Sequence, residues 1–129
     1  MSLTATTHRS IAFRINRSDP TGIPLLMRID RWDARSDGPL TEAALQEKLK
    51  RLGYDPLPRS LPSGVIVSAR THHRPRADAV IAGLLRVTID GESAILTAGD
   101  IVFIPSGAMR RVQPVGDAPV LCIEAVRLA

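Results

Sequence analysis

The chain has 129 residues, of which 44% are hydrophobic and 23% charged, and its formal net charge is +4. This length and composition predict one folded domain with its own core and exclude a low-complexity chain. The single cysteine, Cys122, excludes an internal disulfide, and its apolar neighbours predict a buried, inert thiol. No segment is long and apolar enough to span a membrane, and no secretory signal begins the chain. We therefore expect a cytoplasmic protein without membrane contacts.

Arginine supplies nearly all of the positive charge, because Lys48 and Lys50 are the only lysines. Its planar guanidinium forms bidentate contacts with carboxylate and phosphate groups. The excess indicates either a compositional bias or an anionic partner. Nucleic acid is not expected as that partner, because aromatic residues make up only 3% of the chain and no binding motif is recognised.

The first 24 residues are rich in Thr, Ser, Arg and turn formers. They predict an N-terminal arm that is either flexible or laid as a strand on a neighbouring sheet. Residues 25–32 predict a strand with Leu25, Met27 and Ile29 on one side, and the polar run 33–39 ends it. We place a single domain over 25–129.

One helix is predicted over 41–52. Thr41 is a favourable N-cap, and Gly53 supplies the C-terminal stop. Leu45, Leu49 and Leu52 fall on one helical face. We expect this leucine stripe to pack across the outside of a sheet, with a dimer contact as the alternative, and the charged residues to face solvent.

The rest of the chain predicts short strands separated by turns. Residues 54–63 contain three prolines and predict an extended connection rather than a strand. Strands are expected over 65–73, 84–89, 95–96, 101–104 and 120–126. Turn signals lie at Asp90-Gly91, Gly99-Asp100 and Gly116-Asp117. Strands of this length and spacing predict an all-β sandwich or barrel.

One motif resembles a known family. Gly99 and Asp100, the apolar strand 101–104, Pro105 and Gly107 resemble the second conserved motif of the cupins, in which a His follows. The resemblance covers residues 61–127 and implies a cupin-like double-stranded β-helix, or jelly-roll, barrel, as in small single-domain bacterial cupins. Many cupins are homodimers with exchanged N-terminal strands, so we expect a homodimer in which the arm 1–24 takes that role.

The family's metal-binding positions are occupied differently in this chain. Counting from Gly64 and from Gly83 gives one register, in which the four ligand positions hold Arg70, His72, Arg76 and Arg110. Arginine does not coordinate metal ions, and three guanidiniums repel a cation. We therefore expect a degenerate metal site and no cofactor. A β-bulge would offer an alternative, a divalent transition metal held by His72, His73 and Asp78.

Three functional hypotheses follow. The leading one is a non-metal protein that binds a small anionic ligand, a carboxylate or phosphate, in the barrel lumen. Its binding residues are Arg70, His72, Arg76 and Arg110. Asp78 and Glu124 are the candidate internal partners of these arginines, because the other nearby acids fall in turns.

The second hypothesis is a metal-dependent enzyme of dioxygenase or isomerase type that uses His72 and His73. The third is a non-catalytic interaction or regulatory module whose arginine heads reach solvent. Arg74 and Arg111 alternate with the inward set and are expected outside. No catalytic residue is assigned, and whether the protein is an enzyme stays open.

Overall fold

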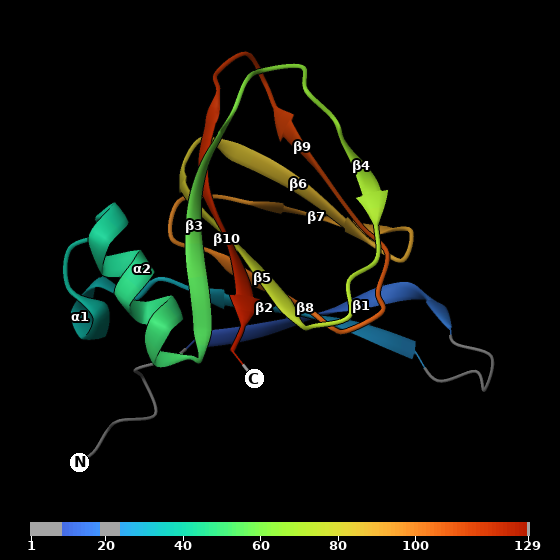
Figure 1. The fold of residues 1–129 in the computed structure, drawn as a ribbon, viewed down its shortest axis with the longest axis horizontal. Coiled ribbons are helices and arrows are strands. Elements are labelled where there is room, and N and C mark those ends of the chain that lie inside the picture. The colour runs from blue at the N-terminus through green and yellow to red at the C-terminus, as the bar shows by residue number, and fades with distance from the viewer. Residues whose placement is uncertain (1–8, 19–23, 129) are drawn as a thin grey trace.

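The computed structural model describes residues 9–18 and 24–128, which form two antiparallel sheets and two helices (Figure 1). The six-stranded sheet has the order β1-β2-β8-β5-β10-β3, and the four-stranded sheet has the order β4-β9-β6-β7. The strands are β1 (Arg9–Ser18), β2 (Pro24–Arg31), β3 (Tyr54–Leu61), β4 (Val67–Arg70), β5 (Arg76–Ala82), β6 (Leu84–Ile89), β7 (Glu92–Leu96), β8 (Ile101–Ile104), β9 (Arg110–Val115) and β10 (Val120–Arg127). The all-β prediction is confirmed.

The main core lies between the two sheets. Because successive strand residues point to opposite faces, a strand can place alternate residues in this layer. Met27 of β2, Val80 of β5 and Val102 of β8 meet Leu85 of β6 and Val112 of β9, and all five are at most 3% exposed. At one end of this interior the apolar residues give way to charged ones, which form the candidate site.

Helix α2 (Glu42–Arg51) covers the outer face of the six-stranded sheet, as predicted (Figure 1). The Thr41 hydroxyl accepts a hydrogen bond from the amide of Ala44 at 3.0 Å and caps the helix. Leu45 and Leu49 are fully buried in an outer cluster that includes Ile123 of β10. The helix therefore packs against the outer face of β10, the strand that carries Glu124.

The expectation that all the helix charges face solvent is wrong for Lys48. Its side chain is 1% exposed, and its ammonium lies 3.0 Å from the Asp37 carboxylate. The same ammonium lies 5.1 Å from the centroid of the Trp32 ring. Asp37 ends α1 (Ala34–Asp37), a short helix within the predicted polar run 33–39. The Lys48–Asp37 ion pair thus links α1 to α2.

The segment with three prolines forms a strand, so the predicted connection over 54–63 is wrong. β3 pairs with β10 along its whole length, from Tyr54↔Arg127 to Leu61↔Val120. Pro56 and Pro58 are tolerated because β3 is an edge strand. Proline has no N–H, so it fits at alternate positions whose amide side faces the free edge.

Other segments differ from the predicted boundaries too: β7 (Glu92–Leu96) is longer than the predicted strand 95–96, and β9 (Arg110–Val115) was not predicted. The strand expected over 65–73 is shorter, because β4 covers only Val67–Arg70. β5, which lies at the centre of its sheet, was not predicted. Four of its consecutive residues, 77–80, are buried, because the strand is covered on both faces.

Part of the predicted N-terminal arm is a strand. β1 pairs with β2 of the same chain from Arg9↔Arg31 to Ser18↔Pro24. Of the alternatives, a strand on a neighbouring sheet is therefore the one found for residues 9–18. Residues 1–8 and 19–23 lie outside the described residues. The domain boundary at residue 25, the homodimer and the exchange of strands between copies stay predictions.

Candidate ligand-binding cavity

A cavity of about 360 Å³ lies between the two sheets. It is lined by residues of β3, β4, β5, β9, β10 and the β4–β5 loop: Leu57, Arg59, Val67, Arg70, His72, Arg76, Arg110 and Glu124. The structure thus brings together the four predicted site residues, Arg70, His72, Arg76 and Arg110. The cavity also contains Arg59, which was not predicted as a site residue because its strand was not predicted.

Arg110 lies deepest in this site and is held by two carboxylates. Its Nε donates to Asp78 Oδ2 at 2.6 Å and its Nη2 to Asp78 Oδ1 at 2.9 Å. Nη2 also donates to Glu124 Oε2 at 3.0 Å. The three side chains are 5%, 2% and 9% exposed. Asp78 and Glu124 are therefore internal partners of the arginines, as the sequence indicated.

The pKa values in this group reflect burial and mutual charge. Burial raises the pKa of the Asp78 carboxyl, and the adjacent Arg110 guanidinium opposes that effect. Burial disfavours the charged form of Arg110, but Asp78 and Glu124 outweigh it and raise the pKa of the guanidinium. Arg110 is thus fixed as a cation whose best donors are already engaged.

Glu124 connects Arg110 to the arginines nearer the cavity mouth. Its Oε1 accepts a hydrogen bond from Arg59 Nη1 at 3.1 Å and lies 3.9 Å from Arg76 Nη2. The side chain of Arg59 is 45% exposed, whereas that of Arg76 is 19% exposed. Arg76 is therefore the less solvated of the two and is only weakly paired.

Arg70 has no hydrogen-bond or ion-pair partner among the described residues. It lies directly opposite Arg110 in the β4–β9 pair, so both side chains project from the same face of the sheet. Like charges in such a pair repel each other, and the nearby carboxylates, Asp78 and Glu124, pair with Arg110, Arg59 and Arg76 and not with Arg70. Arg70 therefore brings an uncompensated positive charge to the cavity.

His72 is neutral near pH 7. Burial and the neighbouring guanidiniums of Arg76, Arg110 and Arg70 lower its pKa below 6.5. Its Nδ1 lies 3.5 Å from Arg76 Nη1. Among the described residues, His72 Nε2 and Arg76 Nε are the buried side-chain polar atoms that have no hydrogen-bond partner. Both belong to side chains that line the cavity.

The cavity residues do not fit a divalent metal ion. In the described part of the chain, no three His, Cys, Asp or Glu residues lie in an arrangement that would hold a metal. His73 is exposed and does not line the cavity, and Asp78 is engaged by Arg110. The alternative set of His72, His73 and Asp78 is therefore not assembled, and the guanidiniums around His72 would repel a cation.

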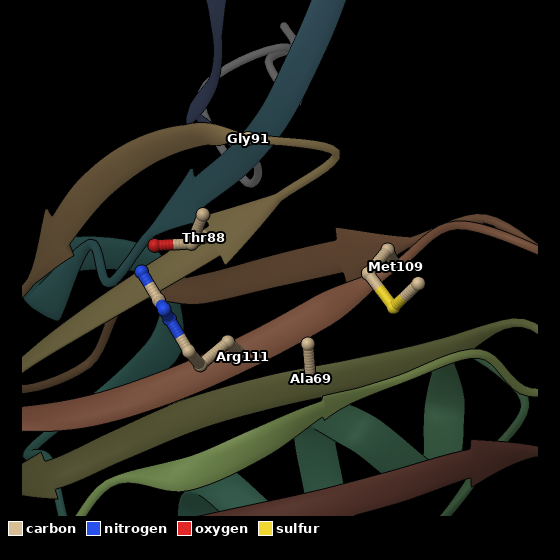
Figure 2. A pocket seen from close by; sticks show the side chains of 5 residues that line it. All are labelled: Ala69, Thr88, Gly91, Met109 and Arg111. Atoms are coloured by element: carbon tan, nitrogen blue, oxygen red, sulfur yellow. The ribbon is translucent and has the colours of Figure 1, made fainter.

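The residues expected outside are outside. Arg74 and Arg111 are exposed, and Arg111 alternates with Arg110 along β9. Arg111 borders a separate hollow of about 220 Å³ together with Ala69, Thr88, Gly91 and Met109 (Figure 2). This hollow contains one charged side chain and no carboxylate. Cys122 is buried as predicted, and burial raises the pKa of its thiol to about 12.

This fold, two antiparallel sheets enclosing a central site, defines a jelly-roll barrel of the cupin type. The sequence matches the model of the family described as "Cupin domain" over residues 60–126. The chain therefore belongs to the cupin domain family, as the motif around Gly99 indicated.

Solved structures agree with this fold. A cupin protein from Bacteroides fragilis is 26% identical, with a TM-score of 0.54 over 66% of this chain and 74% of that one. An RmlC-like cupin from Shewanella frigidimarina is 21% identical, with a TM-score of 0.53 over 60% and 68%. A salicylate 1,2-dioxygenase from Pseudaminobacter salicylatoxidans is 16% identical, with a TM-score of 0.50 over 64% and 30%.

Curated protein sequences contain no match to the chain. Within residues 9–18 and 24–128, no helix has the length and apolar character needed to cross a membrane.

Proposed function

We propose that this protein binds a small anionic ligand, a carboxylate or a phosphate, in the cavity between its sheets. The observation that carries the proposal is the charge of that cavity. Four guanidiniums line it, from Arg59, Arg70, Arg76 and Arg110, and the carboxylate facing them is that of Glu124. With Asp78 behind Arg110, the group keeps an excess of two positive charges, since His72 is neutral.

A bound anion would remove an unfavourable free energy that unpaired guanidinium groups cause in the unliganded protein. Buried guanidiniums are unfavourable unless they are paired, and a buried donor without a partner costs about 1–3 kcal/mol. Arg76 has such a donor, its buried Nε, whereas Arg70 is exposed and brings a positive charge that has no partner among the described residues. A ligand oxygen beside these two side chains supplies the missing acceptor and the missing charge.

Binding would be measured by thermal shift and by isothermal titration with a panel of small carboxylates and phosphates. A ligand that binds only the folded protein raises its melting temperature. We expect at least one member of the panel to do so, and R76Q and R70Q each to weaken its binding at least tenfold. Arg86, an exposed arginine of β6 outside the cavity, gives the matched control R86Q, which keeps wild-type affinity.

The alternatives give different results in the same experiments. An interaction module without a ligand shows no anion-dependent shift in the wild type. A metal-dependent enzyme of dioxygenase or isomerase type using His72 and His73 retains a stoichiometric transition metal after purification, which elemental analysis detects. Either result would overturn the proposal. The fold itself does not decide among these functions, because one barrel hosts many chemistries.

A further inference from the structure

Two apolar side chains, Leu57 of β3 and Val67 of β4, line the cavity among its charged residues, and they limit which anion it suits. We infer that the ligand is a monocarboxylate with a compact apolar body: Arg70 and Arg76 hold its head, and Leu57 and Val67 contact its body. This inference rests on the proposed function and narrows its ligand class. The first observation is which guanidinium donors have no acceptor within the protein.

Two of the four guanidiniums are already committed. Arg110 uses Nε and Nη2 for Asp78 and Glu124, and Arg59 donates to the other oxygen of Glu124. Arg70 has no such partner among the described residues, and Arg76 reaches Glu124 only at 3.9 Å. The ligand head therefore belongs between Arg70 and Arg76, beside the neutral ring of His72.

The charge to be neutralised there is small. Arg59 is 45% exposed, so solvent and salt screen much of its charge. Arg70 is also exposed, whereas Arg76 is 19% exposed and lies against a histidine that carries no counter-charge. A single negative charge next to Arg76 neutralises most of the poorly screened positive charge in this part of the cavity. A phosphate dianion exceeds it and loses more hydration on entry.

The apolar residues in the lining explain why a purely polar anion is a poor fit. Leu57 of β3 is 59% exposed and lines this cavity beside Glu124, its cross-strand partner on β10. Val67 of β4 lines the cavity too and packs against the main core. An apolar body on Leu57 and Val67 removes their surface from water, which inorganic phosphate or oxalate does not do.

The size of the cavity sets the limit for that body. A volume of 360 Å³ equals about a dozen waters at roughly 30 Å³ each, so a branched aliphatic or single-ring carboxylate fits.

The test is a series of probes of equal charge and increasing apolar size, namely acetate, butyrate, 3-methylbutanoate and benzoate, with inorganic phosphate and oxalate beside them. Dissociation constants would be measured by NMR titration, which reaches weak binding. We expect affinity to rise about fourfold for each buried methylene, so that benzoate binds tightest. We expect phosphate and oxalate to bind more weakly than butyrate.

Two variants test the contact of the apolar lining with the ligand body separately from the binding of the carboxylate head. Leu57 is exposed on an edge strand, so Leu57→Ser should not disturb the fold. We expect this variant to bind benzoate at least fivefold more weakly and acetate with unchanged affinity. Its matched control is Leu84→Ser, an exposed leucine of β6 that does not line the cavity. Tighter binding of phosphate or oxalate than of benzoate, or no effect of Leu57→Ser on benzoate, overturns this inference and leaves the proposed function standing. No binding by any anion overturns both.

Discussion

Arg110 of β9 and Asp78 of β5 form a bidentate ion pair that joins the two sheets, with donor–acceptor distances of 2.6 and 2.9 Å. The family resemblance places a metal ligand at the position of Arg110. Here a guanidinium and two carboxylates occupy that part of the barrel. The interior of this cupin is therefore cross-linked by its own side chains.

Replacing Arg110 tests this cross-link. R110M leaves Asp78 buried without its cation, and we expect the free energy of unfolding to fall by about 3–5 kcal/mol. R111M, which alters the exposed neighbour, is expected to change it by less than about 0.5 kcal/mol. Urea denaturation followed by circular dichroism measures both. The double variant R110M/D78L should regain part of the loss, and equal stability of R110M and R111M would contradict the prediction.

Lys48 gives a similar prediction on the outer face. K48A breaks an ion pair with Asp37 whose side chains are 1% and 3% exposed, so we expect a loss of about 3 kcal/mol or more. Lys50 of the same helix pairs with Glu47 in solvent, with 54% and 61% of the side chains exposed. K50A is therefore expected to cost less than about 0.5 kcal/mol. The same denaturation experiment compares them, and a cost of K48A as small as that of K50A would refute burial of the pair.

Gly99 is required by space as well as by conformation. Its φ is +89°, and a Cβ at this position would overlap the Trp32 Cβ. Gly116 has a φ of +88° and nothing within 4 Å of its would-be Cβ. G116A thus measures backbone strain alone, about 1–3 kcal/mol, and we expect G99A to cost about 1–3 kcal/mol more. Equal melting temperatures of the two variants would show that Trp32 moves aside freely.

His72 makes stability depend on pH in a defined direction. Its folded pKa is lowered from 6.5 by burial, Arg76, Arg110 and Arg70, so the unfolded chain binds the proton more readily. The free energy of unfolding should therefore fall as the pH drops below 6.5, and H72Q should show a shallower fall. Denaturation at constant ionic strength between pH 7.5 and about 5 measures the slopes. A wild-type slope identical to that of H72Q would contradict the prediction.

Local rules predicted several elements well. Thr41 and the leucine spacing gave a helix close to its observed limits, since capping and periodicity are properties of neighbouring residues. The Gly99 motif gave the limits of β8, residues 101–104, as they are observed. The grouping of Arg70, His72, Arg76 and Arg110 followed from the family resemblance, counted from Gly64 and Gly83 for the first three residues and from the Gly99 motif for Arg110. Their proposed role in binding is still to be tested.

The misses depend on partners distant in the sequence. Lys48 was predicted as a solvated helix charge, because its neighbours in the sequence do not show that Asp37 and Trp32 cover it in the fold. Arg59 enters the cavity because β3 pairs with β10, which three prolines argued against. Asp78 and Glu124 were expected to pair with the arginines, but the sequence does not show that Arg110 would take both of them. Such competition between partners is decided only in the folded chain.

The prolines of β3 have one further consequence. An uncapped sheet edge is a template on which another polypeptide can add as a new strand. With Pro56 and Pro58 on its outer rim, β3 lacks donors at those two positions, and no continuous ladder can form there. This side of the molecule should thus resist fibril-like stacking even in concentrated solution.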